Sequence, residues 1–141
     1  MKKLILGLFL VIMLVACSSP KDVQLTLSSV GDTMKYDQEV LSVKAGSKVT
    51  LTFINSAKMA GMNHNVVILK PKTNVKKFAS DALAHGPSYV PPSDNIIAYT
   101  AMSNPGETVT VSFTIDKSGY YPFVCTYPGH ATSMQGVIRV N

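Results

Sequence analysis

Three side chains that can bind a metal lie close together near the C-terminus: Cys125, His130 and Met134. Pro128 and Gly129 lie between them and favour a sharp turn, so one tight loop would carry all three side chains. A thiolate, an imidazole and a thioether are soft or borderline ligands, and two histidines and one cysteine with a weak axial methionine form a set that suits copper. The loop therefore holds three candidate ligands and needs a second histidine from elsewhere in the chain.

The chain offers two further histidines, His64 and His85. His64 lies two residues before an apolar run at 66–69 where a strand would begin, while Cys125 comes at the end of another apolar strand. Strand ends at one pole of a β-sandwich can converge, so we predict that His64 is the remaining ligand. His85 lies beside Gly86 at the end of a predicted helix, and we interpret it as an ordinary surface histidine.

The elements that would position these ligands are mostly short strands, because apolar and polar residues alternate along much of the chain. The expected strand ranges are 23–30, 40–43, 49–53, 66–69, 96–100, 108–115, 120–125 and 137–140. Apolar residues at helical spacing between Val75 and Leu83 predict one amphipathic helix over 74–84, with Gly86 just past its end. Seven to eight strands with one inserted helix favour an all-β fold, a Greek-key β-sandwich.

The strand that leads into Cys125 also predicts where the thiol points. Tyr121, Phe123 and Cys125 share one face of a strand, and aromatic side chains normally take the buried face, so Cys125 is expected to point inward. Pro122 lies on the other face and donates no backbone hydrogen bond. The strand is therefore expected to be an edge at Pro122 or to lack a bond there.

The N-terminus has the form of an export signal. Lys2 and Lys3 precede an apolar run at 4–15 that is too short to span a bilayer comfortably, and the following "LVAC" resembles a bacterial lipobox ending at Cys17. This pattern predicts a lipoprotein signal peptide at 1–16, lipid on Cys17, a tether at 17–21 and one domain at 22–141. The alternative is ordinary secretion with a free Cys17.

A lipid on Cys17 would leave Cys125 without an intramolecular disulfide partner, so an exported chain would carry one unpaired thiol. Such a thiol is either buried and inert or has a chemical role. In lipoproteins that resemble this one, a residue other than Asp after the cysteine, here Ser18, favours the outer membrane of Gram-negative cells. In other cells the anchor would lie on the outer face of the cytoplasmic membrane.

The charge pattern excludes one class of partner. The formal net charge of +5 is spread along the chain, with no basic block interleaved with aromatic residues, so nucleic acid binding is not indicated. The chain is expected to be a monomer.

The segments "CTYPGHATSM", "QGVIRV" and "GMNHN" resemble the azurin and auracyanin branch of the cupredoxins, in which the gaps between Cys, His and Met are the same. The resemblance implies one type 1 copper ion that cycles between Cu(I) and Cu(II). His64, Cys125 and His130 would be its equatorial ligands and Met134 its axial ligand. Nearby, Asn65 would tie the His64 strand to the Cys125 loop and donate near the sulfur, with Thr126 beside it.

Two positions depart from the azurin pattern. Azurins have Gly before the first histidine, with its carbonyl near the metal on the side opposite the methionine, whereas this chain has Asn63 there. Azurins also carry a disulfide near the N-terminus, for which this chain has no cysteines. Its first sheet is therefore expected to be held by packing alone.

The function expected from these features is single-electron transfer outside the cytoplasmic membrane, between a respiratory donor and a terminal reductase, oxidase or peroxidase. In proteins that resemble this one, electrons enter through the edge of the C-terminal histidine. An apolar rim of residues around that edge is the predicted partner patch, with simple loop packing as the alternative. Its members are Met59, Met62, Tyr127, Pro128 and Gly129.

Two other classes of function are alternatives to electron transfer. A small copper oxidoreductase would need an additional copper site rich in histidine, which the three histidines of this chain do not provide. A copper chaperone or buffer would use exposed Met and His residues rather than an inward thiolate. Both classes are therefore disfavoured.

Overall fold

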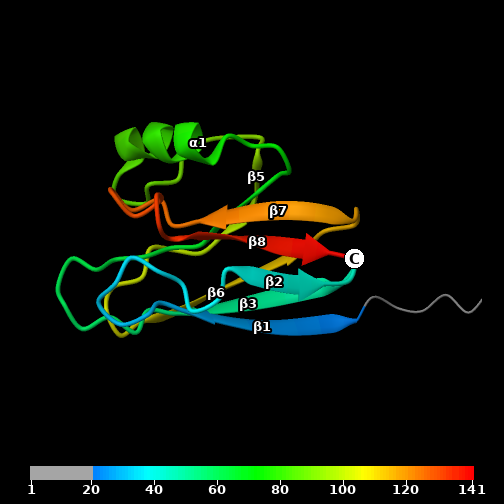
Figure 1. The fold of residues 1–141 in the computed structure, drawn as a ribbon, viewed down its shortest axis with the longest axis horizontal. Helices are drawn as coiled ribbons and strands as arrows, with labels where there is room; N and C mark the ends of the chain where they lie inside the picture. Colours follow the sequence, from blue (N-terminus) through cyan, green and yellow to red (C-terminus); the bar gives the residue numbers. More distant parts are fainter. Residues whose placement is uncertain (1–20) are drawn as a thin grey trace, which may run out of the picture.

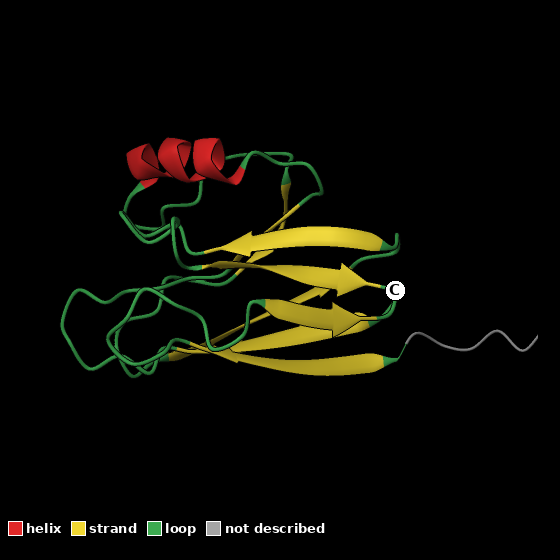
Figure 2. Ribbon diagram, in the orientation of Figure 1, coloured by secondary structure: helices red, strands yellow, loops and turns green. Residues whose placement is uncertain are grey.

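Two β-sheets pack face to face in the computed structural model, which describes residues 21–141 (Figures 1 and 2). The predicted signal peptide at 1–16 and the predicted lipid site at Cys17 lie outside the described residues. The first sheet has the order β1 (Asp22–Ser28), β3 (Lys48–Ile54), β6 (Thr108–Thr114). The second has the order β2 (Val40–Val43), β8 (Gln135–Val140), β7 (Gly119–Val124), β4 (Val67–Leu69), β5 (Ile96–Tyr99).

The sandwich confirms the predicted fold class of eight short strands and one helix. Strand β2 has the predicted bounds, and the other strands differ from the predicted ranges by one or two residues at an end. Two pairs are parallel, β1 with β3 and β2 with β8, and the remaining pairs are antiparallel. Strand β1 ends at Ser28 because Ser29 instead forms an isolated bridge with Tyr36.

The core lies between the two sheets and is built from the alternating apolar residues of both. Leu51 and Phe53 of β3 and Phe123 and Ile138 of the second sheet are fully buried and belong to one cluster. Tyr36 joins this cluster from a loop, with its ring edge-on to Phe53 at a centroid distance of 5.8 Å. Cys125 is the only cysteine among residues 21–141, so no disulfide within these residues can support the first sheet. Packing against the second sheet therefore takes that role.

Helix α1 (Val75–Ala82) lies against the outer face of the five-stranded sheet (Figure 2). Its Phe78 packs with Val67, Leu69 and Val124 in a second, smaller core cluster. The side chain of Asn74 caps the helix by accepting a hydrogen bond of 3.0 Å from the Lys77 N–H. The α-helix ends two residues before the predicted limit and continues as one 3₁₀ turn, η1 (Leu83–His85).

Pro122 lies in β7, an inner strand of the five-stranded sheet, at a point where the strand pairs on one side only. The strand pairs with β8 over its whole length, but it pairs with β4 only at Phe123 and Val124. Pro122 therefore lies where β7 has a neighbour on one side only, so its missing donor removes no bond to β4. The prediction of a local edge is confirmed.

The strands that lead into the site all end at one pole of the sandwich. Strands β1 and β3 run parallel towards it, and β7 ends there just before Cys125 (Figure 1). The start of β1 and the C-terminus lie at the opposite pole (Figure 1). Among residues 21–141, no helix has the length and apolar character needed to cross a membrane.

Candidate metal centre

Three of the predicted ligands converge at the loop pole. The ligand atoms of His64, Cys125 and His130 all lie within 4.8 Å of one another, and the three residues are buried. Cys125 Sγ is 3.8 Å from Nδ1 of each histidine, and the two Nδ1 atoms are 3.0 Å apart. Residues separated by more than sixty positions in the chain thus present one sulfur and two ring nitrogens to a common point.

The backbone of His64 is fixed by a two-way bridge to Ser103. The His64 N–H donates to the Ser103 carbonyl at 3.1 Å, and the Ser103 N–H donates to the His64 carbonyl at 2.8 Å. The Ser103 hydroxyl donates to the same His64 carbonyl at 2.9 Å. The histidine is therefore held just before β4 begins, as the sequence pattern predicted for a strand mouth.

The C-terminal ligand loop is closed by its own backbone. The Cys125 N–H donates to the Met134 carbonyl at 2.9 Å, and the Met134 N–H donates to the His130 carbonyl at 2.9 Å. Gly129 adopts a left-handed φ of 83°, which a residue with a side chain rarely takes, so the sharp turn depends on glycine. Met134 is fully buried in the same core cluster as Cys125.

Asn65 links the two halves of the site, as predicted. Its Oδ1 accepts a hydrogen bond of 2.9 Å from the Thr126 N–H, and its Nδ2 donates to the Thr126 hydroxyl at 2.8 Å. Tyr36 supports this link from the core, because its hydroxyl donates to the Asn65 carbonyl at 2.6 Å. The residue after His64 and the residue after Cys125 are therefore locked together in a buried position.

The protonation of the three ligand residues is set mainly by burial. Burial raises the pKa of the Cys125 thiol to about 11, although backbone hydrogen bonds from Asn65 and Tyr127 oppose this. Burial and, to a smaller extent, the neighbouring His130 together lower the pKa of His64 to about 4. The pKa of His130 is also lowered by burial. At neutral pH both imidazoles are uncharged and can offer a lone pair to a metal.

The donor set fits a copper ion. Two neutral imidazoles and one cysteine aim at a single point, with a methionine in the same buried cluster. This is the combination of soft and borderline donors that suits copper. Because the thiol is protonated at neutral pH in the metal-free site, metal binding should release its proton.

The other predicted positions lie around this centre or away from it. His85 is exposed on η1. Asn63 is half-buried beside His64. In the predicted partner patch, Met59 is 61% exposed and the ring of Tyr127 packs on that of His130 at a centroid distance of 4.9 Å. Of the other patch residues, Met62 is half-buried, and Pro128 and Gly129 are exposed.

Asn55 is a supporting residue that the sequence analysis did not single out. Its side chain is fully buried, and Nδ2 donates to the carbonyls of Met62 at 2.9 Å and Ser103 at 3.0 Å. Both carbonyls belong to the segments that hold His64. The strand pattern indicates that Asn55 is buried, because Leu51, Phe53 and Asn55 follow one another at every second position and so point to the same, buried face.

We expect Asn55→Ala to destabilise the protein by about 2 kcal/mol, because it removes the buried amide that donates to the Met62 and Ser103 carbonyls and accepts from the Ala57 N–H. Urea unfolding of the copper-free protein measures this change. The matched control is Asn95→Ala, at an exposed asparagine, which should change the free energy of unfolding by less than about 0.5 kcal/mol. Equal effects of the two substitutions would contradict the supporting role of Asn55.

The copper-free protein should lose stability as the pH falls from 6.5 towards 4. In that interval the unfolded chain binds a proton at His64, whose ordinary pKa is 6.5, while the folded chain, with a pKa of about 4, does not. His130 is shifted in the same direction. Urea midpoints measured across this interval should therefore fall with pH, and the fall should be shallower in His64→Gln. A flat profile in the unsubstituted protein would contradict the prediction.

Comparison with known proteins agrees with this geometry. A family model described as copper binding proteins of the plastocyanin/azurin family matches residues 23–141. Auracyanin-A of Chloroflexus aurantiacus is 37% identical over 123 residues, which cover 84% of this chain and 75% of that protein. Outer membrane protein H.8 of Neisseria meningitidis is 31% identical over 117 residues, which cover 77% of this chain and 63% of that protein.

Solved structures share the whole fold. Dithionite-reduced auracyanin from Roseiflexus castenholzii has a TM-score of 0.79 at 36% identity, covering 86% of this chain and 98% of that one. Auracyanin A from Chloroflexus aurantiacus, described as a "blue" copper protein, has a TM-score of 0.78 at 35% identity, covering 85% of this chain and 99% of that one.

Proposed function

Because the chain belongs to the plastocyanin/azurin family of copper-binding proteins, we propose that His64, Cys125, His130 and Met134 together bind one type 1 copper ion. The observation that carries this proposal is the convergence of two neutral imidazoles and one thiol within 4.8 Å in a buried site. Met134, fully buried in the same cluster as Cys125, would be the fourth and weaker ligand.

Membership in this family implies electron transfer rather than catalysis, so the chain is an electron carrier and not an enzyme. When bound, copper supplies a one-electron couple. The chain's own residues hold the ligands in place beforehand, through the Asn65–Thr126 link and the bridge between His64 and Ser103. A site whose ligands are already fixed needs little rearrangement when the electron enters or leaves.

The burial of Cys125 argues against a role in copper delivery. A chaperone or buffer must pass its metal to another protein, which requires ligands that a partner can reach. Here Cys125 is fully buried, and His64 is equally inaccessible.

The colour of the copper-loaded protein tests the proposed site. Cu(II) added to the purified protein should give an intense blue from thiolate-to-copper charge transfer. A reductant such as ascorbate should bleach the blue, and reoxidation should restore it. His85→Ala should behave in the same way, because His85 is exposed and does not belong to the cluster of ligand atoms. A colourless copper complex would contradict the assignment.

Met134→Leu should keep the blue colour and raise the reduction potential by about 60 mV, a tenfold change for a one-electron couple. The reason is that Cu(I) prefers a lower coordination number than Cu(II), so the loss of the weak fourth donor destabilises Cu(II) more than Cu(I). The matched control is Met102→Leu, at a half-buried methionine outside the ligand cluster, which should leave the potential unchanged. A lowered potential in Met134→Leu would count against the ligand role.

We further propose that the protein is tethered by lipid on Cys17 and works in the cell envelope, outside the cytoplasmic membrane. The supporting observations are the "LVAC" segment and the name of a relative, outer membrane protein H.8. Growth with a labelled fatty acid should label the protein, and Cys17→Ser should remove this label because it removes the thiol that carries the lipid. A label that persists in Cys17→Ser would show that the lipid is not on Cys17.

The proposed redox partners are a respiratory donor and a terminal reductase, oxidase or peroxidase, which would dock on the patch formed by Met59, Met62, Tyr127, Pro128 and Gly129. The contact between the rings of Tyr127 and His130 supports an electron route from this patch to the site. Identifying the component of a membrane extract that reduces the purified blue protein would test this proposal.

A further inference from the structure

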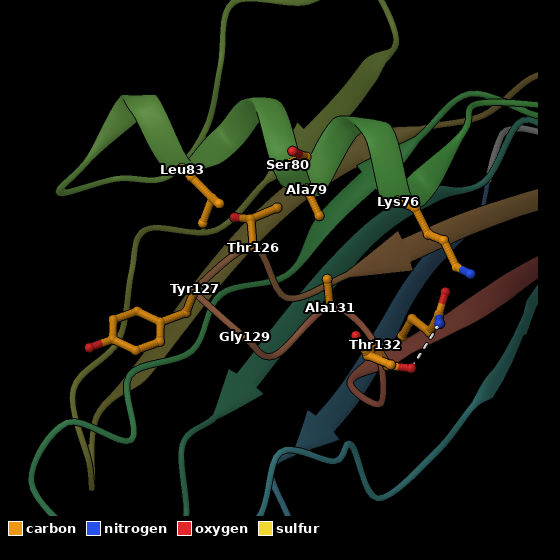
Figure 3. Close-up of a pocket in the computed structure, with 10 residues that line it drawn as sticks. Lys76, Ala79, Ser80, Leu83, Thr126, Tyr127, Gly129, Ala131 and Thr132 are labelled. Atoms are coloured by element: carbon orange, nitrogen blue, oxygen red, sulfur yellow. Dashed lines mark hydrogen bonds between the residues drawn. The ribbon is translucent and has the colours of Figure 1, made fainter.

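A groove of about 430 Å³ lies between helix α1 and the C-terminal ligand loop (Figure 3). One wall is formed by Lys76, Ala79 and Leu83 of the helix segment. The other wall and the floor come from the loop, with Thr126, Tyr127 and Thr132 among the lining residues. Leu83 is 54% exposed although it is a large apolar residue, so the groove offers both an apolar surface and a lysine.

The segment that contains helix α1 carries the net positive charge of residues 21–141, and one of its lysines, Lys76, lines the groove. Residues 70–82 contain four lysines and a single acidic residue, Asp81. Elsewhere in residues 21–141, seven basic residues are balanced by seven acidic ones. Lys77 is paired with Asp81 at 2.8 Å, whereas Lys76, on the groove wall, has no ion pair within residues 21–141. This wall is therefore complementary to a negatively charged ligand.

The floor of the groove is in direct contact with the proposed copper ligands. Thr126 is bonded to Cys125 in the chain and hydrogen-bonded to Asn65, the neighbour of His64. The ring of Tyr127 packs on the ring of His130. A molecule seated in the groove would thus lie one residue from the cysteine.

We infer that this groove docks an acidic, extended segment of a redox protein, with a carboxylate near Lys76 and an apolar side chain on Ala79 and Leu83. The inference rests on the proposed function, because the groove matters for electron transfer only if Cys125 binds copper. Tyr127 and Gly129 belong both to the groove and to the apolar patch, so one partner can cover both surfaces at once.

The test uses the purified protein in its diamagnetic Cu(I) form and a synthetic peptide in which Asp and Glu alternate with Leu. The titration is followed by NMR, and the bound peptide should change the amide chemical shifts of residues in α1 and in the loop at 126–132. Lys76→Glu should weaken peptide binding by about tenfold, since it replaces an attractive charge with a repulsive one. Lys117→Glu is the matched control, because it makes the same change of net charge at the opposite pole, and it should change binding by less than about twofold.

One further protein variant and one altered peptide separate the effect of shape from the effect of charge. Ala79→Phe fills the groove without changing the charge and should also weaken binding, whereas a peptide with Asn and Gln in place of Asp and Glu should not bind. Equal weakening by Lys76→Glu and Lys117→Glu would overturn the inference, because it would indicate attraction to the net charge alone. Chemical-shift changes confined to the loop around Met59 would also overturn the inference, because the peptide would then bind outside the groove.

The same titration is repeated with vesicles of phosphatidylcholine and phosphatidylglycerol. If these vesicles shift the α1 residues while the peptide does not, a membrane surface rather than a protein segment occupies this face, and the inference fails. The blue colour of every variant is measured in parallel. A variant that stays blue but no longer binds the peptide separates the docking groove from the copper site, whereas a protein that never turns blue removes the proposed function itself.

Discussion

Replacing Cys125 by alanine should remove the intense blue absorption completely, while the protein remains folded. The blue band arises from charge transfer between a thiolate and Cu(II), and Cys125 is the only cysteine in residues 21–141. The histidines can still bind Cu(II) without the thiol, so a pale complex is the expected product. Absorption spectra of the two copper-loaded proteins, recorded at equal concentration, measure the change.

The fold of this variant must be checked, because Cys125 is fully buried and its neighbours are core residues. Removing the sulfur leaves a small cavity, which should cost about 1 kcal/mol of unfolding free energy. Urea unfolding of the copper-free variant separates this effect from the loss of colour. If the blue colour persists in Cys125→Ala, the charge-transfer band does not come from Cys125 and the proposed site is wrong.

Gly136→Ala should destabilise the protein by about 3 kcal/mol, because the added Cβ has the closest contacts of any glycine in the described residues. A Cβ atom at Gly136 would lie 2.4 Å from the ring of Phe123 and 2.5 Å from the backbone carbonyl oxygen of Glu39. Phe123 is fully buried and packs on Tyr36, and a backbone carbonyl cannot rotate away as a side chain can. The sheet must therefore shift at the pair formed by Gly136 and Phe123.

The matched control is Gly86→Ala, which adds the same methyl group where the nearest atom is 3.4 Å away in the exposed loop after η1. Its effect on the unfolding free energy should be within about 0.5 kcal/mol. Thermal or urea unfolding of the two variants provides the comparison. Similar stability of both variants would contradict the prediction, because it would mean that a methyl group fits at Gly136 without a clash with Phe123.

Local patterns were sufficient to predict most of the framework of the site. The alternation in β6 and β7 predicted strands there, and the shared face of Tyr121 and Phe123 predicted that Cys125 would be buried. The turn at Gly129 predicted a tight ligand loop. Each of these predictions depends on neighbouring residues in the chain, which is why one sequence was enough.

The features that could not be predicted depend on contacts between distant segments. The parallel pairing of β1 with β3 is decided by how the two sheets close around the core. Asn55 continues a buried strand face, but its partners, the carbonyls of Met62 and Ser103, come from two loops whose approach no local pattern specifies. The groove likewise exists only because α1 is placed beside the ligand loop.

The position of the two ends of the sandwich has a consequence for how far the protein can reach. Strand β1 begins at the pole opposite the ligand loop, so a lipid on Cys17 would attach the domain by its far end (Figure 1). Five residues of tether, fully extended, span at most about 18 Å. The domain would therefore stay close to the membrane, with the pole that carries the ligand loop facing away from the membrane surface. Such an arrangement favours partners that diffuse past the membrane over partners embedded beside the anchor.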